Sequence, residues 1–281
     1  MPIHDELGTR IKEFYESVPK TKLMRRTPVA IRIDGKAFHT FTRGFNKPFD
    51  NVLISAMQDT MKYLCENIQG CVLGYTQSDE ITLILVDYKR LNSSAWFDYE
   101  VQKVCSIAAS MATMAFNKFF ESNVEKENDN FTAEWLDEDT DNPNYKNKKL
   151  ENLWRVHDKA LKKGAMFDAR CFNIPKEEVT NLVYWRQLDA TRNSIQMVGQ
   201  ANFSHKELQG KSCEKIKEML IAEKGISWED FHPMYKHGSC CIKVTTETDG
   251  VTRSSWEIDK NIPLFVGEGR EYIESLIQSE E

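Results

Sequence analysis

Apolar segments follow one another in an order that permits few folds. Strands are expected at residues 28–34, 71–75, 81–86 and 167–174, and helices at about 50–70 and 94–120. Asp50 is a suitable N-cap for the first of these helices. The order strand, helix, strand, strand, helix, strand is that of the ferredoxin-like fold. The sequence therefore predicts an α+β fold whose βαββαβ antiparallel sheet carries helices on one face.

The remaining segments add helices and a hairpin to this unit. Helices are expected at residues 7–18, 176–202, 212–223 and 271–278, and strands at 239–246 and 251–258, joined through Asp249-Gly250. We therefore predict a core at residues 1–175 and an extension at 176–281, packed as one compact unit and forming a second layer. Residues 123–152 are polar and acidic, which indicates a surface excursion that is partly mobile.

Carboxylates stand at the ends of two of the predicted strands. Asp34 ends the first strand, while Asp79 and Glu80 lie in a five-residue loop, 76–80, before the third. Strands one and three are antiparallel neighbours in this topology, so residues far apart in sequence are expected to meet. Two carboxylates without histidine or cysteine nearby favour a hard cation such as Mg²⁺. The alternative is that each acid merely accepts hydrogen bonds from nearby turn amides.

The residues around the acids suit a polyphosphate. The amides of residues 35–39 follow Asp34 directly and predict a cradle for phosphate oxygens. Lys36, Lys47 and Lys103 are candidates to neutralise the remaining charge. Two divalent ions at such a site can activate an attacking hydroxyl and stabilise a leaving phosphate oxygen.

Charge is unevenly distributed along the chain. The net charge of −6 excludes a uniformly basic nucleic-acid binder, yet eight Lys or Arg residues lie between positions 20 and 47 with Asp34 as the only acid. Such a local positive field suits a polyphosphate or an RNA backbone, although a solvated charged face is equally consistent. No N-terminal signal and no apolar run of about 18 residues is evident, so we expect a cytoplasmic protein.

Several short motifs resemble those of one known family. They are Arg32-Ile33-Asp34-Gly35-Lys36 with Phe38-His39, Lys47-Pro48 with Asp50, Gln77-Ser78-Asp79-Glu80, Phe167-Asp168 with Arg170, Trp185-Arg186-Gln187 with Asp189, and Leu208-Gln209-Gly210. Together they resemble the tRNA-His guanylyltransferase family. The resemblance implies a palm domain, similar to that of polymerases and cyclases, that adds nucleotides in the 3′-to-5′ direction after the tRNA 5′-end is adenylylated by ATP.

The resemblance also implies roles for individual residues. Asp34, Asp79 and the carbonyl of Gly35 would hold two Mg²⁺ ions, with Glu80 beside them as a further catalytic residue. The triphosphate of ATP, GTP or another NTP would be contacted by Lys36, Ala37, Phe38, His39, Lys47 and Ser78, while Lys103 and Arg32 would serve the activation step or the RNA 5′-end. Members of the family bind tRNA and are typically homotetramers, arranged as dimers of dimers.

Departures from the family pattern guide the choice of substrate. Guanylyltransferases follow the Trp-Arg-Gln stretch with His-Ile-Asn-Asn-Leu-Tyr-Asn, whereas residues 191–197 here read Thr-Arg-Asn-Ser-Ile-Gln-Met, and a basic position is replaced by Glu100. This favours the Thg1-like branch, which repairs tRNA 5′-ends against a template. The alternatives are addition of G at position −1 of tRNA-His, a palm-fold nucleotide cyclase, and a tRNA-binding module with a vestigial metal site.

For three residues, a structural role is considered beside the functional one. Trp185 is predicted to be a core residue rather than a platform for a base. Arg186 is expected either in ordinary helical ion pairs or at an RNA contact. His39 follows the phosphate cradle and is interpreted as functional, with helix capping as its alternative.

Overall fold

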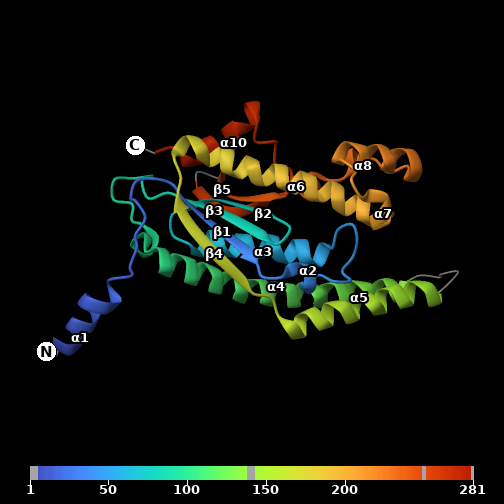
Figure 1. Ribbon diagram of the computed structural model, residues 1–281, viewed down its shortest axis with the longest axis horizontal. Coiled ribbons are helices and arrows are strands. Elements are labelled where there is room, and N and C mark those ends of the chain that lie inside the picture. Colours follow the sequence, from blue (N-terminus) through green and yellow to red (C-terminus); the bar gives the residue numbers. More distant parts are fainter. Residues whose placement is uncertain (1–5, 138–142, 249–250, 280–281) are drawn as a thin grey trace.

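The sheet is the centre of the molecule (Figure 1). The computed structural model describes residues 6–137, 143–248 and 251–279, and the side chains of all of these except 129–137, 143–150 and 248. The strands are β1 Val29–Gly35, β2 Cys71–Gln77, β3 Glu80–Leu85, β4 Phe167–Asn173, β5 Ser239–Thr248 and β6 Val251–Asp259. They pair antiparallel in the order β4-β1-β3-β2-β5-β6.

Each predicted helix is present among the described residues, but the one expected at residues 94–120 begins later and runs further. The described helices are α1 Glu6–Ile11, α2 Phe38–Phe41, α3 Asn51–Asn67, α4 Val101–Asp137, α5 Pro143–Lys163, α6 Val179–Asn202, α7 His205–Leu208, α8 Cys213–Met219, α9 Pro233–His237 and α10 Glu271–Glu274. Of these, α2, α5, α7 and α9 were not predicted. Short 3₁₀ turns cover Trp96–Tyr99, Lys176–Glu178, Trp228–Asp230, Gly267–Arg270 and Ser275–Ile277, and π turns cover Lys12–Glu16 and Leu220–Lys224. In the described ranges, no helix is both long and apolar enough to cross a membrane.

The predicted ferredoxin-like topology is confirmed. β1 lies between β4 and β3, and Asp34 pairs in register with Glu80 on one side and with Asp168 on the other. Directly paired residues of antiparallel strands project to the same face of a sheet. The register therefore puts these three acids on one face, at the end of β1.

The two faces of the sheet are covered by different helices. Ile31 and Ile33 of β1 face the core formed with α3 and α4, whereas Ala30 faces the core formed with α6 and α10. A strand buried on both sides explains the continuous apolar run that predicted β1. Arg32 and Asp34 have the parity of Ala30 and therefore lie on the α6 side.

The extension contributes both a second layer and part of the sheet. α6 and α10 form the predicted layer, seen above the sheet in Figure 1. The hairpin β5–β6 instead continues the sheet, because Tyr75 and Gly74 of β2 pair with Cys240 and Cys241 of β5. The expectation that this hairpin belongs to the second layer is wrong. Its predicted Asp249-Gly250 turn lies outside the described residues.

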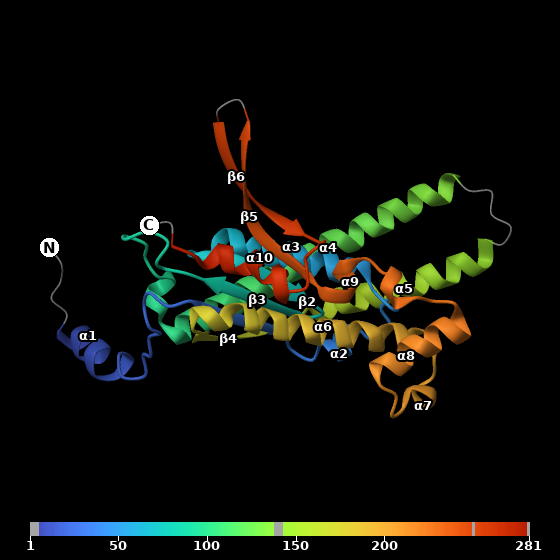
Figure 2. The same ribbon diagram turned by 90° about the horizontal axis from the view of Figure 1, so that it is seen from above.

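The expected surface excursion at residues 123–152 is mostly helical. α4 runs on to Asp137 and α5 begins at Pro143, and Figure 2 shows both helices projecting from the body as one arm. Acidic and basic residues have high helix propensity, so polarity alone did not argue against a helix. Residues 138–142 lie outside the described part of the chain.

The N-terminal helix is found where its apolar spacing predicts it, as α1 and the turn that follows. Its apolar side chains are exposed, with Leu7 at 59%, Phe14 at 65% and Tyr15 at 66%. Figure 1 shows α1 standing away from the sheet. The apolar spacing therefore correctly predicts an amphipathic helix, but the apolar side of that helix does not pack into the core.

Candidate active site

Asp34 and Asp79 lie together at one end of the sheet. The predicted five-residue loop is a two-residue turn, because Gln77 pairs with Glu80 and only Ser78 and Asp79 stand between the strands. Ser78 has φ 50°, the left-handed conformation that such a tight turn needs. The amide of Gly35 donates to the carbonyl oxygen of Asp79 at 3.0 Å, which ties the end of β1 to this turn.

The electrostatics of this pair favour a cation. Burial raises the pKa of Asp79, and the negative charges of Asp34 and Glu80 raise it further, while a hydrogen bond from Ser78 acts in the opposite direction. No described residue donates a hydrogen bond to the Asp34 carboxylate or pairs with it as an ion. Two neighbouring acids without a cationic partner are the arrangement that a bound divalent ion would neutralise.

The donor set fits magnesium rather than zinc. Among the described residues, no three His, Cys, Asp or Glu side chains are grouped so that they could hold a metal by themselves. Mg²⁺ is commonly held by one or two carboxylates together with substrate phosphates and waters. The pair Asp34 and Asp79 meets that requirement, with further oxygens to come from the main chain and a phosphate.

Glu80 differs from the two aspartates because arginines hold both of its oxygens. Arg32 donates to Oε1 from Nε at 3.0 Å and from Nη2 at 2.8 Å, and Nη2 of Arg186 lies 2.7 Å from Oε2. Glu80 is 6% exposed and Arg186 7%. The same Arg186 nitrogen lies 2.7 Å from Asp189. Glu80 therefore joins α6 to the sheet and fixes Arg32, rather than offering free oxygens to an ion.

Trp185 is not the core residue that the sequence predicts. Its side chain is 51% exposed on α6, and its ring is approached by the guanidinium carbons of Arg186 at 4.5 Å and Arg32 at 5.2 Å. The neighbouring Val183 is fully buried instead. Helical spacing identified an apolar face of α6 but misplaced Trp185 relative to it.

The predicted phosphate cradle is only partly available. The amide of Gly35 is bonded to Asp79, and that of Lys36 donates to the carbonyl of Met166 at 2.8 Å. The amides of residues 37–39 remain, with Ala37 in the left-handed region at φ 55°. Lys36 and His39 are exposed beside them.

The Phe38 side chain points away from the free amides of residues 37–39 and into the core. It is 4% exposed and packs against Phe41, Phe116 and Phe167. A Cβ at position 35 would lie 2.2 Å from the Phe38 ring, so only glycine fits there. Phe38 therefore anchors the loop after Asp34, and its expected contact with a triphosphate would come from its main chain.

Ser78 adjoins Asp79 and its hydroxyl donates to the Asp79 carboxylate at 3.0 Å, whereas Lys103 lies away from the aspartates. Lys47 is exposed in the loop that leads to Asp50. Along α4, Thr113 accepts a hydrogen bond from the amide of Phe167, at the start of β4 and level with Gly35. Lys103 is ten residues earlier in α4, about 15 Å along the helix axis. It lies at the far end of the sheet, over the Phe97 ring at 4.9 Å.

Asp50 and His157 hold the Lys47 loop in place. The Asp50 carboxylate caps α3 by accepting from the Leu53 amide at 3.0 Å, as predicted, and it also accepts from the Asn46 amide at 3.0 Å. His157 Nε2 lies 3.0 Å from the same carboxylate, and both side chains are 4% exposed. Burial acts to raise the pKa of Asp50, but these hydrogen bonds lower it overall.

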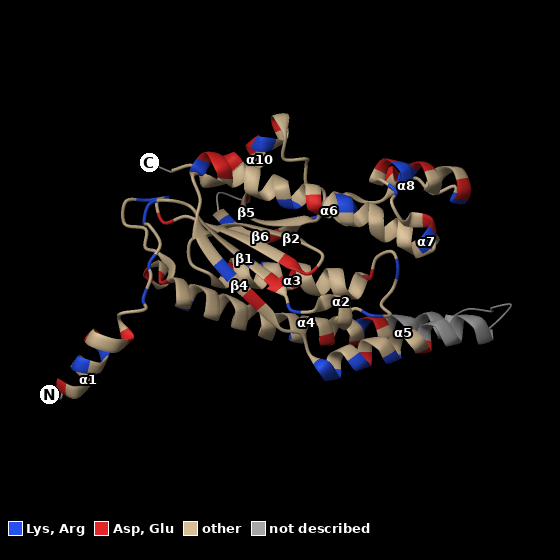
Figure 3. Cartoon of the chain, in the orientation of Figure 1, with Lys and Arg blue, Asp and Glu red and all other residues tan. Residues whose placement is uncertain are grey.

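Half of the eight basic residues between positions 20 and 47 precede β1 and lie away from Asp34. Arg25 pairs with Asp87 at 2.6 Å, and Lys22 pairs with Asp98. These residues precede β1, and a seven-residue strand is about 20 Å long. The expected positive field around Asp34 is therefore reduced to Arg32, Lys36 and the following loop. The adjacent strand β4 carries one acidic residue, Asp168, and one basic residue, Arg170 (Figure 3).

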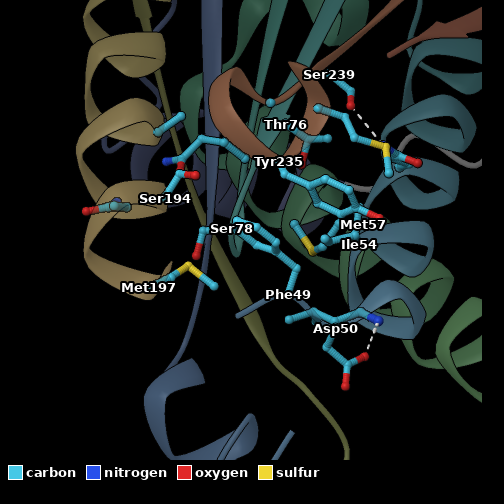
Figure 4. A pocket seen from close by; sticks show the side chains of 17 residues that line it. Phe49, Asp50, Ile54, Met57, Thr76, Ser78, Ser194, Met197, Tyr235 and Ser239 are labelled. Carbon is cyan, nitrogen blue, oxygen red and sulfur yellow. Dashed lines mark hydrogen bonds between the residues drawn. The ribbon is translucent and has the colours of Figure 1, made fainter. Parts of the chain in front are cut away.

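A pocket beside the aspartates was missed by the sequence reasoning. It measures about 100 Å³ and lies between α3, the end of β2, α6 and α9 (Figure 4). Its lining is Phe49, Asp50, Leu53, Ile54, Met57, Gln58, Thr76, Gln77, Ser78, Ala190, Asn193, Ser194, Met197, Met234, Tyr235, Gly238 and Ser239. Phe49 stacks on Tyr235 with ring centroids 4.7 Å apart, and Gln58 donates to Ser239 at 2.8 Å.

The position of this pocket matters more than its size. Ser78 belongs both to its wall and to the turn that carries Asp79. An apolar pocket with polar side chains in its wall, next to a carboxylate pair, suits the base of a nucleotide whose phosphates reach the carboxylates. Four separate segments form the pocket. The sequence offered partial signals for it, because Asp50, Gln77 and Ser78 of its lining belong to the recognised motifs.

The chain matches known proteins over nearly its whole length. The family model described as tRNAHis guanylyltransferase matches residues 8–175. A bacterial tRNA(His) guanylyltransferase (Thg1)-like protein, solved in complex with ATP, is 38% identical with a TM-score of 0.77, over 97% of this chain and 99% of that one.

Two further relatives are more distant. An uncharacterized protein of Acanthamoeba polyphaga mimivirus is 27% identical, over 90% of this chain and 82% of the relative. The tRNA(His) guanylyltransferase of Saccharomyces cerevisiae is 20% identical with a TM-score of 0.58, over 87% of this chain and 93% of that one, which supports the fold alone. Because the family model spans more than half of the residues, the chain belongs to the tRNAHis guanylyltransferase family of nucleotidyltransferases.

Proposed function

We propose that the protein is a template-dependent 3′–5′ nucleotidyltransferase that repairs the 5′-ends of tRNAs. The observation that carries this proposal is the unneutralised pair Asp34 and Asp79, next to a pocket with an aromatic and apolar lining. The similarity to structures of a bacterial Thg1-like protein in complex with ATP and in complex with GTP supports nucleotides as substrates.

The reaction would proceed in two displacements. An oxygen of the RNA 5′-phosphate attacks the α-phosphorus of ATP, and pyrophosphate leaves. The 3′-hydroxyl of the incoming nucleotide then attacks the adenylylated 5′-phosphorus, so that a phosphodiester bond forms and AMP leaves. Each step joins two anionic partners, and cationic groups are needed where they meet.

Asp34, Asp79 and the carbonyl oxygen of Gly35 would hold two Mg²⁺ ions at this point. Bound magnesium would polarise phosphate oxygens and lower the pKa of the attacking hydroxyl. The protein's own groups do the rest. Lys36, Lys47 and Ser78, together with the amides of residues 37–39, would bind and orient the triphosphate.

The pocket would take the adenosine of the activating ATP. Phe49 and Tyr235 offer an aromatic wall, while Met57 and Met197 offer adaptable apolar contacts. Such a lining favours a planar base. The incoming nucleotide would lie outside this pocket, where it can pair with the template base.

The proposal is tested by pyrophosphate release from ATP or GTP, with and without a tRNA transcript that lacks its first nucleotide. We expect release to require the RNA, and nucleotide addition to follow the base opposite the gap. Release without RNA would indicate a cyclase, and addition of G regardless of the template would indicate the tRNA-His activity. No release with any RNA would indicate a binding module.

Asp79→Asn should lower addition by about 10³-fold or more while tRNA affinity changes by only a few-fold, since a metal ligand acts mainly in the transition state. Asp158→Asn is the matched control, because Asp158 lies on α5 and, among the described residues, pairs only with Lys162. We also propose a cytoplasmic homotetramer, which light scattering of the purified protein can check.

A further inference from the structure

Trp185 stands exposed beside the candidate active site with its ring held in place. Arg32, two residues before Asp34 on β1, lies against this ring, and so does Arg186. Both arginines are bonded to Glu80, which is itself buried. The ring therefore rests on a fixed, charged support while half of its surface remains open to solvent.

The support is not explained by stability alone. The Nε of Arg186 is buried and has no hydrogen-bond partner among the described residues, which is unfavourable for folding. An arginine that served only to pair with Glu80 and Asp189 would gain by satisfying that nitrogen. Its position instead places the guanidinium under an exposed indole, where a cation–π contact orients the ring.

The proposed reaction needs two places for bases. The pocket holds one nucleoside, and the RNA end must be held separately. Trp185 precedes Asn193 of the pocket wall by eight residues of α6, about 12 Å along the helix axis. Arg32 places it on the β1 side of α6, across from the pocket formed with α3 and α9.

The charge around Trp185 suits a nucleic-acid strand. Arg170 of β4 lies opposite Arg32 in strand register; it pairs with Asp168 at 3.1 Å, and its side chain is 57% exposed. Arg192, two turns along α6 from Trp185, pairs with Asp189 and is 65% exposed. These cations can contact backbone phosphates while an indole face stacks on a base. The pocket, in contrast, is lined by apolar and neutral polar residues apart from Asp50.

We propose that Trp185 is the stacking platform for the unpaired RNA base opposite the missing 5′-nucleotide. This rests on the proposed templated addition. An unpaired base exposes a π-face that paired bases bury within the duplex, so it gains most from an aromatic side chain. Stacking on a ring that Arg32 and Arg186 already orient would hold the template base next to Asp34.

A binding cycle between Trp185 and that base tests the proposal. Affinity is measured without nucleotide and in EDTA, for a tRNA lacking its first nucleotide and for the same RNA with an abasic residue at the facing position. Wild-type protein should bind the intact RNA about 10-fold more tightly than the abasic RNA. Trp185→Ala should bind both RNAs equally, and Trp185→Phe should retain most of the difference.

Trp154→Ala is the matched control, because Trp154 is equally exposed at 49% but lies on α5. It should behave as wild type. The proposal is overturned if Trp185→Ala lowers the affinity for both RNAs by the same factor and so preserves the 10-fold difference, or if it leaves both affinities unchanged. It is also overturned if the variant has a different oligomer mass, which would mean that another copy of the chain covers the ring. Because no catalysis is involved, these outcomes stay separate from a failure of nucleotide addition.

Discussion

Arg186 of α6 reaches the sheet and places its Nη2 atom 2.7 Å from Oε2 of Glu80. Both side chains are 8% exposed, so this is a buried ion pair between two layers. Arg186→Ala should lower the free energy of unfolding by about 3 kcal/mol, because it leaves the buried Glu80 and the partly exposed Asp189 with fewer partners. Urea unfolding measures it.

Arg192→Ala provides the comparison for this prediction. Arg192 pairs with the same Asp189 but is 65% exposed, so its loss should cost about 0.5 kcal/mol. Equal costs for the two variants would show that burial of the Arg186 pair has no energetic consequence.

Asp79 should make the metal-free protein less stable as the pH rises. Burial raises its pKa above the usual 3.8, so its favourable contribution is complete below about pH 4 and is lost as the pH rises through the folded-state pKa. In EDTA at neutral pH, Asp79→Asn should therefore melt at a higher temperature than wild type, by a few degrees for about 1 kcal/mol.

Magnesium should reverse this order. Ion binding stabilises the folded state of the wild type through Asp34 and Asp79, and the variant loses one of these ligands. Thermal scans with increasing MgCl₂ should raise the wild-type melting temperature more than that of Asp79→Asn. A parallel rise in both proteins would argue against a site at this pair.

Asp50 should show the opposite pH dependence. Its pKa is lowered, so its contribution is complete above about pH 4 and disappears as the pH falls through the folded-state pKa. Asp50→Ala should cost about 2 kcal/mol at pH 7 by removing the α3 cap and leaving His157 without its partner. Measured by urea unfolding, the difference from wild type should shrink at pH 3; a constant difference would contradict the assignment.

Gly35→Ala should be poorly tolerated. The added methyl group would lie 2.2 Å from the Phe38 ring, and the aromatic cluster around Phe38 leaves that ring little room to move. We expect a loss of about 2 kcal/mol or more in unfolding free energy. At Gly210, nothing lies within 4 Å and φ is +73°, so Gly210→Ala should cost only about 1 kcal/mol, from the backbone alone.

The sequence was enough to predict the central βαββαβ unit and the proximity of Asp34 and Asp79. Strands buried on both faces give apolar runs that end sharply at Asp34, and the order of elements determines which strands are neighbours. Their meeting at one site followed from topology, without any knowledge of side-chain contacts.

Other features depend on geometry that periodicity does not contain. Trp185 belongs to an apolar helix, but how α6 is rotated on the sheet decides that Val183 is buried and Trp185 is not. Lys103 lies ten residues before Thr113, the α4 residue that is level with the end of β1. This separation becomes clear only once β4 is aligned with α4. Four segments that are far apart in sequence form the pocket, so no local sequence pattern could predict it.

The tightness of the Ser78–Asp79 turn limits how this protein can change. Side chains alternate along a strand, so inserting or deleting one residue in the turn would shift β3 against β2 and send Glu80 to the opposite face. Arg32 and Arg186 would then lose their shared partner as Asp79 moved away from Asp34. Natural variation in chain length should therefore be absent from this turn and tolerated elsewhere, since no loop remains here to absorb an extra residue.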